Sequence, residues 1–326
     1  MSNISGDFFI TKKGKLSRGS ARDTVVPVHP SAQGRAARHA RQEAERRREQ
    51  SEELIRSTIS HRTLETHFQP IVNLKSGGAV GTEALARFVQ PPFRPPDVWF
   101  AEAASVGLGV ELELIALELA LEQLHRLPSG LYLSLNASVE TILSEQFRSS
   151  LTGAPAERIV LELTEHTEVT DYLSFERSIQ QLRSQGVRLA VDDAGAGFAS
   201  FRHILNLQPD VIKLDIGLTR GIDSDPARRA LGRALLSFGM DAYNASIVAE
   251  GIETKDEFNT LRALGFSAGQ GFYLGRPSRL PLQRPTVAAF EQPRPLEVPS
   301  VVHRAPAPKL QRLRPLEIPS LPFLGA

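Results

Sequence analysis

Between residues 66 and 273, short apolar runs alternate with longer amphipathic stretches, and this alternation restricts the possible folds more than any other feature. Apolar runs this short are typical of buried β-strands. The eight runs are His67–Asn73, Ala79–Arg87, Leu131–Asn136, Ile159–Thr164, Arg188–Asp192, Val211–Asp215, Ser246–Ala249 and Ala268–Tyr273. Helical patterns fill most of the intervals, including Val110–Leu127, Ser174–Gln185, Arg228–Tyr243 and Lys255–Leu264. This alternation predicts an α/β fold, a closed TIM-like (β/α)8 barrel.

The first two apolar runs depart from this pattern, because no helix fits between them. Only a short segment that contains Gly77 and Gly78 separates them, and this is the spacing of a β-hairpin. We therefore expect an antiparallel first strand in the barrel.

Charge is distributed unevenly along the 326 residues, although the formal net charge is only +1. Residues 1–60 carry 12 basic and 7 acidic side chains, and residues 279–326 carry 7 basic and 3 acidic ones. The total then leaves a net charge of −8 for residues 61–278. We expect this acidic segment to form the barrel domain and the two basic segments to be tails.

The N-terminal tail divides into two parts. Residues 1–34 are rich in Ser, Gly, Lys and Arg and lack hydrophobic periodicity, so disorder is expected. From Arg35 to about Ser60, Ala, Arg, Glu and Gln dominate, and opposite charges have the spacing of helical pairs. This pattern favours a solvated lead-in helix, with binding of an anion, a membrane surface or a partner as the alternative.

The C-terminal tail is rich in proline, with ten prolines in residues 279–326, which indicates a disordered segment. A short repeat stands out within it, because Arg294–Ser300 recurs in nearly identical form as Arg314–Ser320. The repeat is interpreted either as a duplication within a disordered tail or as two extended ligands for a groove on a partner protein.

Composition excludes several classes of protein. The chain has no cysteine, which rules out disulfides and thiolate zinc sites. No apolar run reaches the length of a membrane span, and the N-terminus lacks the apolar stretch of a signal peptide. We therefore expect a cytoplasmic protein without a membrane span, and no duplex nucleic acid among its partners.

Polar and charged side chains lie at the ends of the second to the eighth predicted strands. The carboxyl ends of barrel strands meet at one mouth, where active sites are built. These residues are Glu83, Arg87, Asn136, Glu162, Asp192, Asp193, Lys213, Asp215, Glu250 and Gln270.

Six of these side chains are carboxylates, and Lys213 offsets only one of their charges. A carboxylate cluster that is partly removed from water raises its pKa values or binds cations. Because the candidate ligands are all oxygens, Mg²⁺ or Mn²⁺ is favoured over Zn²⁺. Two such ions would neutralise most of the charge, and a two-metal site suits the cleavage of a phosphodiester.

The motifs, taken in order, resemble a known family over about residues 62–278. They are Phe68–Val72, Thr82–Arg87, Leu135–Ser138, Glu162–Glu165, Asp192-Asp193, Lys213–Asp215, Ala249–Glu253 and Gln270–Pro277. This ordered set resembles the EAL-domain cyclic di-GMP phosphodiesterases. The resemblance implies a (β/α)8 barrel with an antiparallel first strand, which agrees with the hairpin spacing.

The resemblance also implies which residues bind metal. The expected ligands of two Mg²⁺ or Mn²⁺ ions are Glu83, Asn136, Glu162, Asp192, Asp193, Asp215 and Glu250. Of these, Asp192 would bridge the two ions, and Glu83 and Glu250 also belong to the expected catalytic set.

Further roles follow from the same resemblance. Lys213 matches a lysine that holds the attacking water, and Arg87 would contact a substrate phosphate. Gln270 and Glu253 match signature positions that are expected to bind substrate. Glu165 matches a glutamate that steadies the loop after the fifth strand.

That loop departs from the family. After the two aspartates the family commonly has Phe-Gly-Thr-Gly, whereas this chain has Ala194-Gly195-Ala196-Gly197. The implied function is metal-dependent hydrolysis of cyclic di-GMP to linear 5′-pGpG, by a homodimer as is common in the family. The alternative is a non-catalytic cyclic di-GMP receptor that signals through its tails.

Overall fold

The computed structural model describes residues 32–163, 172–195 and 198–282. The chain forms two compact units, Met1–Gln50 and Ser51–Ala326. In the first unit the described residues form the N-terminal part of helix α1 (Ala32–His61), and side chains 38–50 are all exposed. Helix α1 begins at Ala32, slightly before the predicted start at Arg35. The predictions for residues 1–31 and 283–326, for Glu165 and for residues 196–197 of the loop after the fifth strand lie outside the described residues.

Eight strands in the second unit form a closed barrel, and neighbours in the chain are neighbours in the barrel. The strands are β1 (Leu64–Asn73), β2 (Ala79–Phe88), β3 (Tyr132–Asn136), β4 (Ile159–Leu163), β5 (Arg188–Ala194), β6 (Val211–Leu214), β7 (Ser246–Ala249) and β8 (Ala268–Gly269). Strand β1 pairs antiparallel with both β2 and β8, and the other pairs are parallel. The prediction of an α/β barrel with an antiparallel first strand is confirmed.

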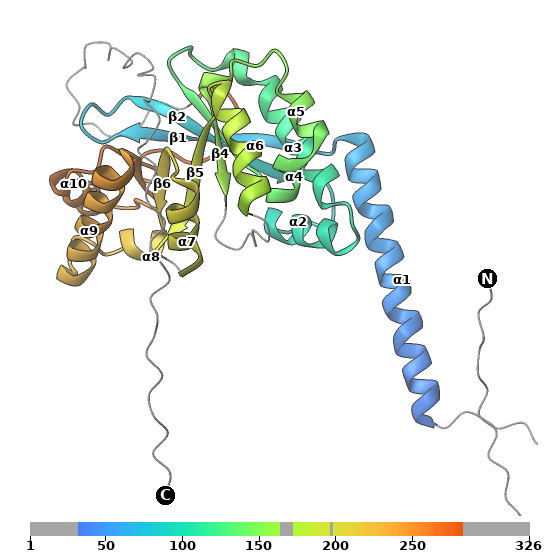
Figure 1. Ribbon diagram of the computed structural model, residues 1–326. Helices are drawn as coiled ribbons and strands as arrows, with labels where there is room; N and C mark the ends of the chain where they lie inside the picture. The colour runs from blue at the N-terminus through green and yellow to red at the C-terminus, as the bar shows by residue number, and fades with distance from the viewer. Residues whose placement is uncertain (1–31, 164–171, 196–197, 283–326) are drawn as a thin grey trace, which may run out of the picture. The chain divides into compact units, whose positions relative to one another are not determined.

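Helices connect most of the parallel strands and flank the barrel, with α3 to α5 and α9 to α10 on opposite sides (Figure 1). Besides α1 they are α2 (Pro96–Ser105), α3 (Gly109–Glu122), α4 (Val139–Leu143), α5 (Glu145–Ser150), α6 (Tyr172–Ser184), α7 (Phe198–Leu207), α8 (Ile216–Thr219), α9 (Pro226–Tyr243) and α10 (Lys255–Leu264). Two short 3-10 turns cover Leu124–Arg126 and Ala156–Arg158. Within the described ranges, no helix is both long and apolar enough to cross a membrane.

Two strands end earlier than the sequence pattern predicts. Strand β8 stops at Gly269 instead of continuing to Tyr273, because the chain turns at Gly271 close to another segment. A Cβ atom at Gly271 would lie 2.2 Å from both the backbone nitrogen and the backbone oxygen of Ile252. Strand β6 ends at Leu214, and Asp215 becomes the N-cap of α8.

The barrel interior is apolar at one end and polar at the other. One buried cluster fills the apolar end, formed by Ile71, Val160, Ala190, Val211, Val248 and Ala268, with Val80 and Tyr132 packed against it. Because strand side chains alternate between two faces, residues two positions further along a strand point to the same side. Val160 and Val211 face the interior at the apolar end. Glu162 and Lys213, two residues further along the same strands, therefore face the interior at the carboxyl ends.

Candidate active site

Lys213 lies at the centre of the polar end of the barrel, and its side chain is buried. Its Nζ atom is 2.8 Å from Glu162 Oε2 and 2.8 Å from Glu250 Oε1. Two further carboxylates lie close, with Asp192 Oδ2 at 3.2 Å and Glu83 Oε2 at 3.5 Å from Nζ. One ammonium group therefore faces four carboxylates from β2, β4, β5 and the end of β7.

This imbalance shifts the pKa values of the cluster. Burial raises the pKa of Glu162 to about 8, although Lys213 acts in the opposite direction. Burial also raises the pKa of Glu250 well above its ordinary value, again against the effect of Lys213. Burial alone would lower the pKa of Lys213, but the surrounding carboxylates raise it well above its ordinary value. The site therefore holds more acidic groups than one lysine can keep ionised, so added cations would be favoured.

Glu83 is held by two amide side chains as well as by Lys213. Its Oε1 accepts a hydrogen bond from Asn136 Nδ2 at 2.9 Å, and its Oε2 accepts one from Gln270 Nε2 at 2.6 Å. Burial would raise the pKa of Glu83, but Lys213 and these two amides outweigh it and lower that pKa. Glu83 therefore stays ionised in this site.

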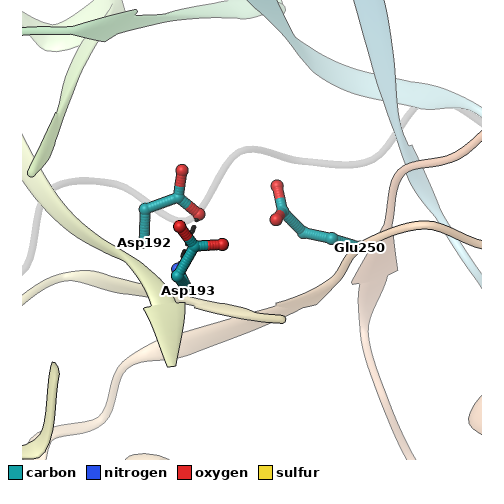
Figure 2. Close-up of side chains that lie close together, drawn as sticks. All are labelled: Asp192, Asp193 and Glu250. Atoms are coloured by element: carbon teal, nitrogen blue, oxygen red, sulfur yellow. Dashed lines mark hydrogen bonds between the residues drawn. The ribbon is translucent and has the colours of Figure 1, made fainter. Parts of the chain in front are cut away.

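Asp192, Asp193 and Glu250 form a group of three carboxylates whose oxygen atoms lie within 4.8 Å of one another. Figure 2 shows the two aspartates at the end of β5 directed toward Glu250. Adjacent residues of a regular strand point to opposite faces, but β5 has an irregular register between Val191 and Ala194. At this irregularity Asp193 adopts a φ of 53°, and its backbone N–H donates to Asp192 Oδ1 at 2.9 Å. The bulge thus lets both aspartates face one point.

This donor set fits a hard divalent cation. All three groups offer carboxylate oxygens, which are the ligands preferred by Mg²⁺, Mn²⁺ and Ca²⁺. The excess of buried acid around Lys213 also favours added positive charge. Asp192, Asp193 and Glu250 are the residues that could hold such an ion.

The structure places other predicted site residues outside this cluster. Asp215 Oδ1 accepts a hydrogen bond from Gly217 N at 2.7 Å, so this carboxylate caps α8. Glu253 is exposed and forms an ion pair with Arg220 at 2.5 Å. Arg87 lies near the end of β2, half-buried, and its Nη1 donates to the backbone oxygen of Ala86 at 2.8 Å.

Two polar residues that the sequence reasoning missed also contact the site. Ser134 Oγ donates to Glu162 Oε1, and Gln69 Oε1 accepts from Gln270 Nε2 at 2.9 Å. Both could have been found from strand geometry. Ser134 precedes Asn136 by two residues on one strand, and Gln69 lies opposite Glu83 in the hairpin.

Curated proteins with similar sequences include enzymes of cyclic di-GMP metabolism. The probable cyclic di-GMP phosphodiesterase PdeG of Escherichia coli K12 is 29% identical over 239 residues, which are 69% of this chain and 47% of PdeG. The bifunctional diguanylate cyclase/cyclic di-GMP phosphodiesterase MucR of Pseudomonas aeruginosa is 30% identical over 235 residues, 68% of this chain and 34% of MucR. This chain therefore spans less than half the length of each of these relatives.

Solved structures agree with the barrel topology. The structure of the PaMucR phosphodiesterase in a c-di-GMP complex has a TM-score of 0.62 and 28% identity, and covers 70% of this chain and 97% of that chain. The EAL domain family itself matches residues 52–277, which is more than half of the sequence. This chain belongs to the EAL domain family.

Proposed function

We propose that this chain is a metal-dependent phosphodiesterase that hydrolyses cyclic di-GMP to linear 5′-pGpG. The observation that carries the proposal is the buried cluster around Lys213, where one ammonium faces four carboxylates. The names of PdeG and MucR support this substrate, as does the c-di-GMP complex of the PaMucR phosphodiesterase.

Asp192, Asp193 and Glu250 would hold a divalent cation, with Glu83, Asn136 and Glu162 as further oxygen ligands. A bound Mg²⁺ or Mn²⁺ would supply positive charge that activates water and stabilises the phosphate oxygens. The ammonium of Lys213 lies among its carboxylate neighbours at the polar end of the barrel, and there it would hydrogen-bond the attacking water. An ammonium at this position favours hydroxide character in that water.

Arg87 and Gln270 complete the proposed site. The half-buried guanidinium of Arg87 near the end of β2 would bind a phosphate oxygen of the substrate. Attack of water on phosphorus then breaks one P–O3′ bond and opens the ring to 5′-pGpG. Further proposals, from the resemblance and the sequence, are a cytoplasmic homodimer and a partner protein for the C-terminal repeat.

The test is a hydrolysis assay on the purified full chain with cyclic di-GMP and Mn²⁺, with the product measured by chromatography. We expect 5′-pGpG from the wild type. We expect at least about a 100-fold loss in Glu83→Gln, since even residues that only support metal ligands cost up to this factor. Asp241→Asn, an exposed carboxylate at the end of α9, is the matched control and should retain full activity.

A different result of the same assay would contradict the proposal. If the wild type and Glu83→Gln both yield no product while calorimetry shows tight cyclic di-GMP binding, the phosphodiesterase proposal fails. That result would instead identify a non-catalytic receptor.

A further inference from the structure

Two glutamine side chains link the backbone after β8 to Glu83. Gln69 Nε2 donates to the backbone oxygen of Gly275 at 3.1 Å, and Gln270 Nε2 donates to Gln69 Oε1 at 2.9 Å. The same Gln270 nitrogen donates to Glu83 Oε2 at 2.6 Å. Both glutamines are buried, with 8% and 4% of their surfaces exposed. The hydrogen bonds therefore form one continuous chain from Gly275 to Glu83.

The groups at the two ends of this chain fix the orientation of both amides. A backbone carbonyl and an ionised carboxylate can only accept hydrogen bonds. The Gln69 nitrogen must therefore face Gly275, which leaves its oxygen for Gln270. In turn, the Gln270 nitrogen must serve both Gln69 and Glu83, so the amide of Gln270 can adopt only one of its two orientations.

This orientation leaves the other end of Gln270 available. Its Oε1 atom is buried and has no hydrogen-bond partner among the residues that the structure describes. A flipped amide would place this oxygen against the carboxylate of Glu83, and two acceptors would then face each other without a proton. Gln69 opposes that flip, because a flipped Gln270 could no longer donate to it.

Gln69 lies at the seam between β1 and β8, where few backbone hydrogen bonds join the two strands. The seam between β1 and β8 has a ladder of only two residue pairs, Val72 with Gly269 and Asn73 with Ala268. The next backbone contact across the seam is the bridge between Phe68 and Ser278. Between these contacts, hydrogen bonds of the Gln69 side chain hold the two sides together at the level of the site.

We propose that Gln69 is a positioning residue, which fixes the amide of Gln270 and, through it, the carboxylate of Glu83. The proposal rests on the proposed phosphodiesterase function for its effect on turnover. Its effect on cation binding rests only on Glu83 being part of the oxygen cluster. Among the described residues no hydrogen bond joins the side chains of Gln69 and Glu83, so Gln69 would act through Gln270.

A double-mutant cycle tests the proposal on the full chain. Gln69→Met keeps the length of the side chain but removes its hydrogen bonds, and Gln270→Met does the same one step further along. We expect Gln69→Met to lower kcat by about 10- to 100-fold with KM little changed. In the Gln270→Met background the same change should lower kcat no further, because Gln69 acts through Gln270.

One further measurement and one further variant strengthen this test. Calorimetry with Mn²⁺ alone should show the same non-additive loss of affinity, and it needs no hydrolysis. Gln69→Asn, which keeps an amide on a shorter stem, is the second variant if Gln69→Met is too unstable to purify. It should show the same coupling to Gln270.

Thr82→Val is the matched control, because Thr82 Oγ1 donates to the backbone oxygen of Gln69 at 2.9 Å in the same hairpin. It should lower the unfolding temperature while kcat and Mn²⁺ affinity stay unchanged. Multiplicative losses in the double mutant, or a loss of kcat in Thr82→Val as large as in Gln69→Met, would overturn the proposal. A wild type that forms no 5′-pGpG would instead refute the phosphodiesterase function, and the Mn²⁺ cycle would still test the positioning.

Discussion

Lys213 illustrates how burial sets the chemistry of individual residues in this barrel. A buried charge without partners is costly, and here four carboxylates surround one ammonium. The pKa of Glu83 falls, whereas the pKa values of Glu162 and Glu250 rise. Glu83 therefore loses its proton more readily than Glu162 and Glu250 do. A bound cation would lower the pKa values of the carboxylates around it, because it stabilises their ionised forms.

Glu162 should therefore make the stability of the metal-free protein depend on pH. Burial raises its pKa from 4.5 to about 8 on folding, so its contribution is fully present below pH 4.5 and is lost as the pH rises toward 8. Glu162→Gln mimics the protonated form at every pH. In EDTA, the wild-type unfolding temperature should fall relative to that of the variant across this window.

The control for this prediction is the same pair of proteins with Mn²⁺. The ion should restore the wild type at neutral pH and have less effect on Glu162→Gln, because the variant has lost a carboxylate ligand. A difference in unfolding temperature that stays constant across the pH range would contradict the assignment of this shift to Glu162.

Strand periodicity shows which site residues could be predicted from the sequence. Glu162 and Lys213 lie two positions beyond buried apolar residues, so their meeting in the barrel followed from the pattern alone. Asp215 lies two positions beyond Lys213, but β6 ends at Leu214 and the Asp215 carboxylate caps α8, a position that strand periodicity does not predict. Glu253 forms an ion pair with Arg220, which lies in a different loop. Local sequence patterns do not predict that these two loops meet.

At the scale of elements, the helix that follows Glu250 is anchored by a capping box. Thr254 Oγ1 accepts from Glu257 N at 3.2 Å, and Glu257 Oε2 accepts from Thr254 N at 3.0 Å. The spacing of these two residues predicts the start of α10, and the observed helix Lys255–Leu264 matches the sequence expectation. The short β8 was not predictable, because it depends on the close approach of Gly271 to Ile252.

Glu257→Ala should destabilise the barrel more than a surface change does. Glu257 is buried, and its other oxygen accepts from Gly221 N at 3.0 Å, so it joins α10 to the segment before α9. Loss of a charged acceptor with several backbone donors costs about 2–3 kcal/mol. Denaturant unfolding measures this, and Asp256→Ala on the exposed side of the same turn should cost only about 0.5 kcal/mol.

The pH dependence of stability provides a further check on the role of Glu257. Burial would raise the pKa of Glu257, but three backbone N–H groups outweigh it and lower that pKa from 4.5. Its contribution is therefore present above pH 4.5 and is lost as the pH falls below that value. Equal losses for Glu257→Ala and Asp256→Ala would show that the capping box contributes nothing beyond the helix dipole.

At the scale of the whole molecule, part of the basic N-terminal segment packs on the barrel domain. The charge pattern sets a boundary near residue 61, but the second compact unit begins at Ser51. Ile55 is fully buried in a cluster with Trp99, and Leu54 and Ile59 pack against it. Phe88 at the end of β2 stacks on Trp99 with ring centroids 4.6 Å apart. The last turns of α1 therefore cover the segment that follows Arg87.

We expect removal of residues 1–50 to leave unfolding temperature and hydrolysis unchanged, and removal of residues 1–61 to damage both. The longer deletion removes the apolar contacts of Ile55 and the hydrogen bond from Gln90 Nε2 to Thr58 Oγ1, which measures 2.5 Å. Ile55→Ala in the full chain isolates the packing part and should cost about 2–5 kcal/mol. Arg56→Ala, its exposed neighbour, should cost less than about 0.5 kcal/mol. If the chain without residues 1–61 unfolds at the same temperature as the chain without residues 1–50, the last turns of α1 are dispensable and the barrel begins at β1.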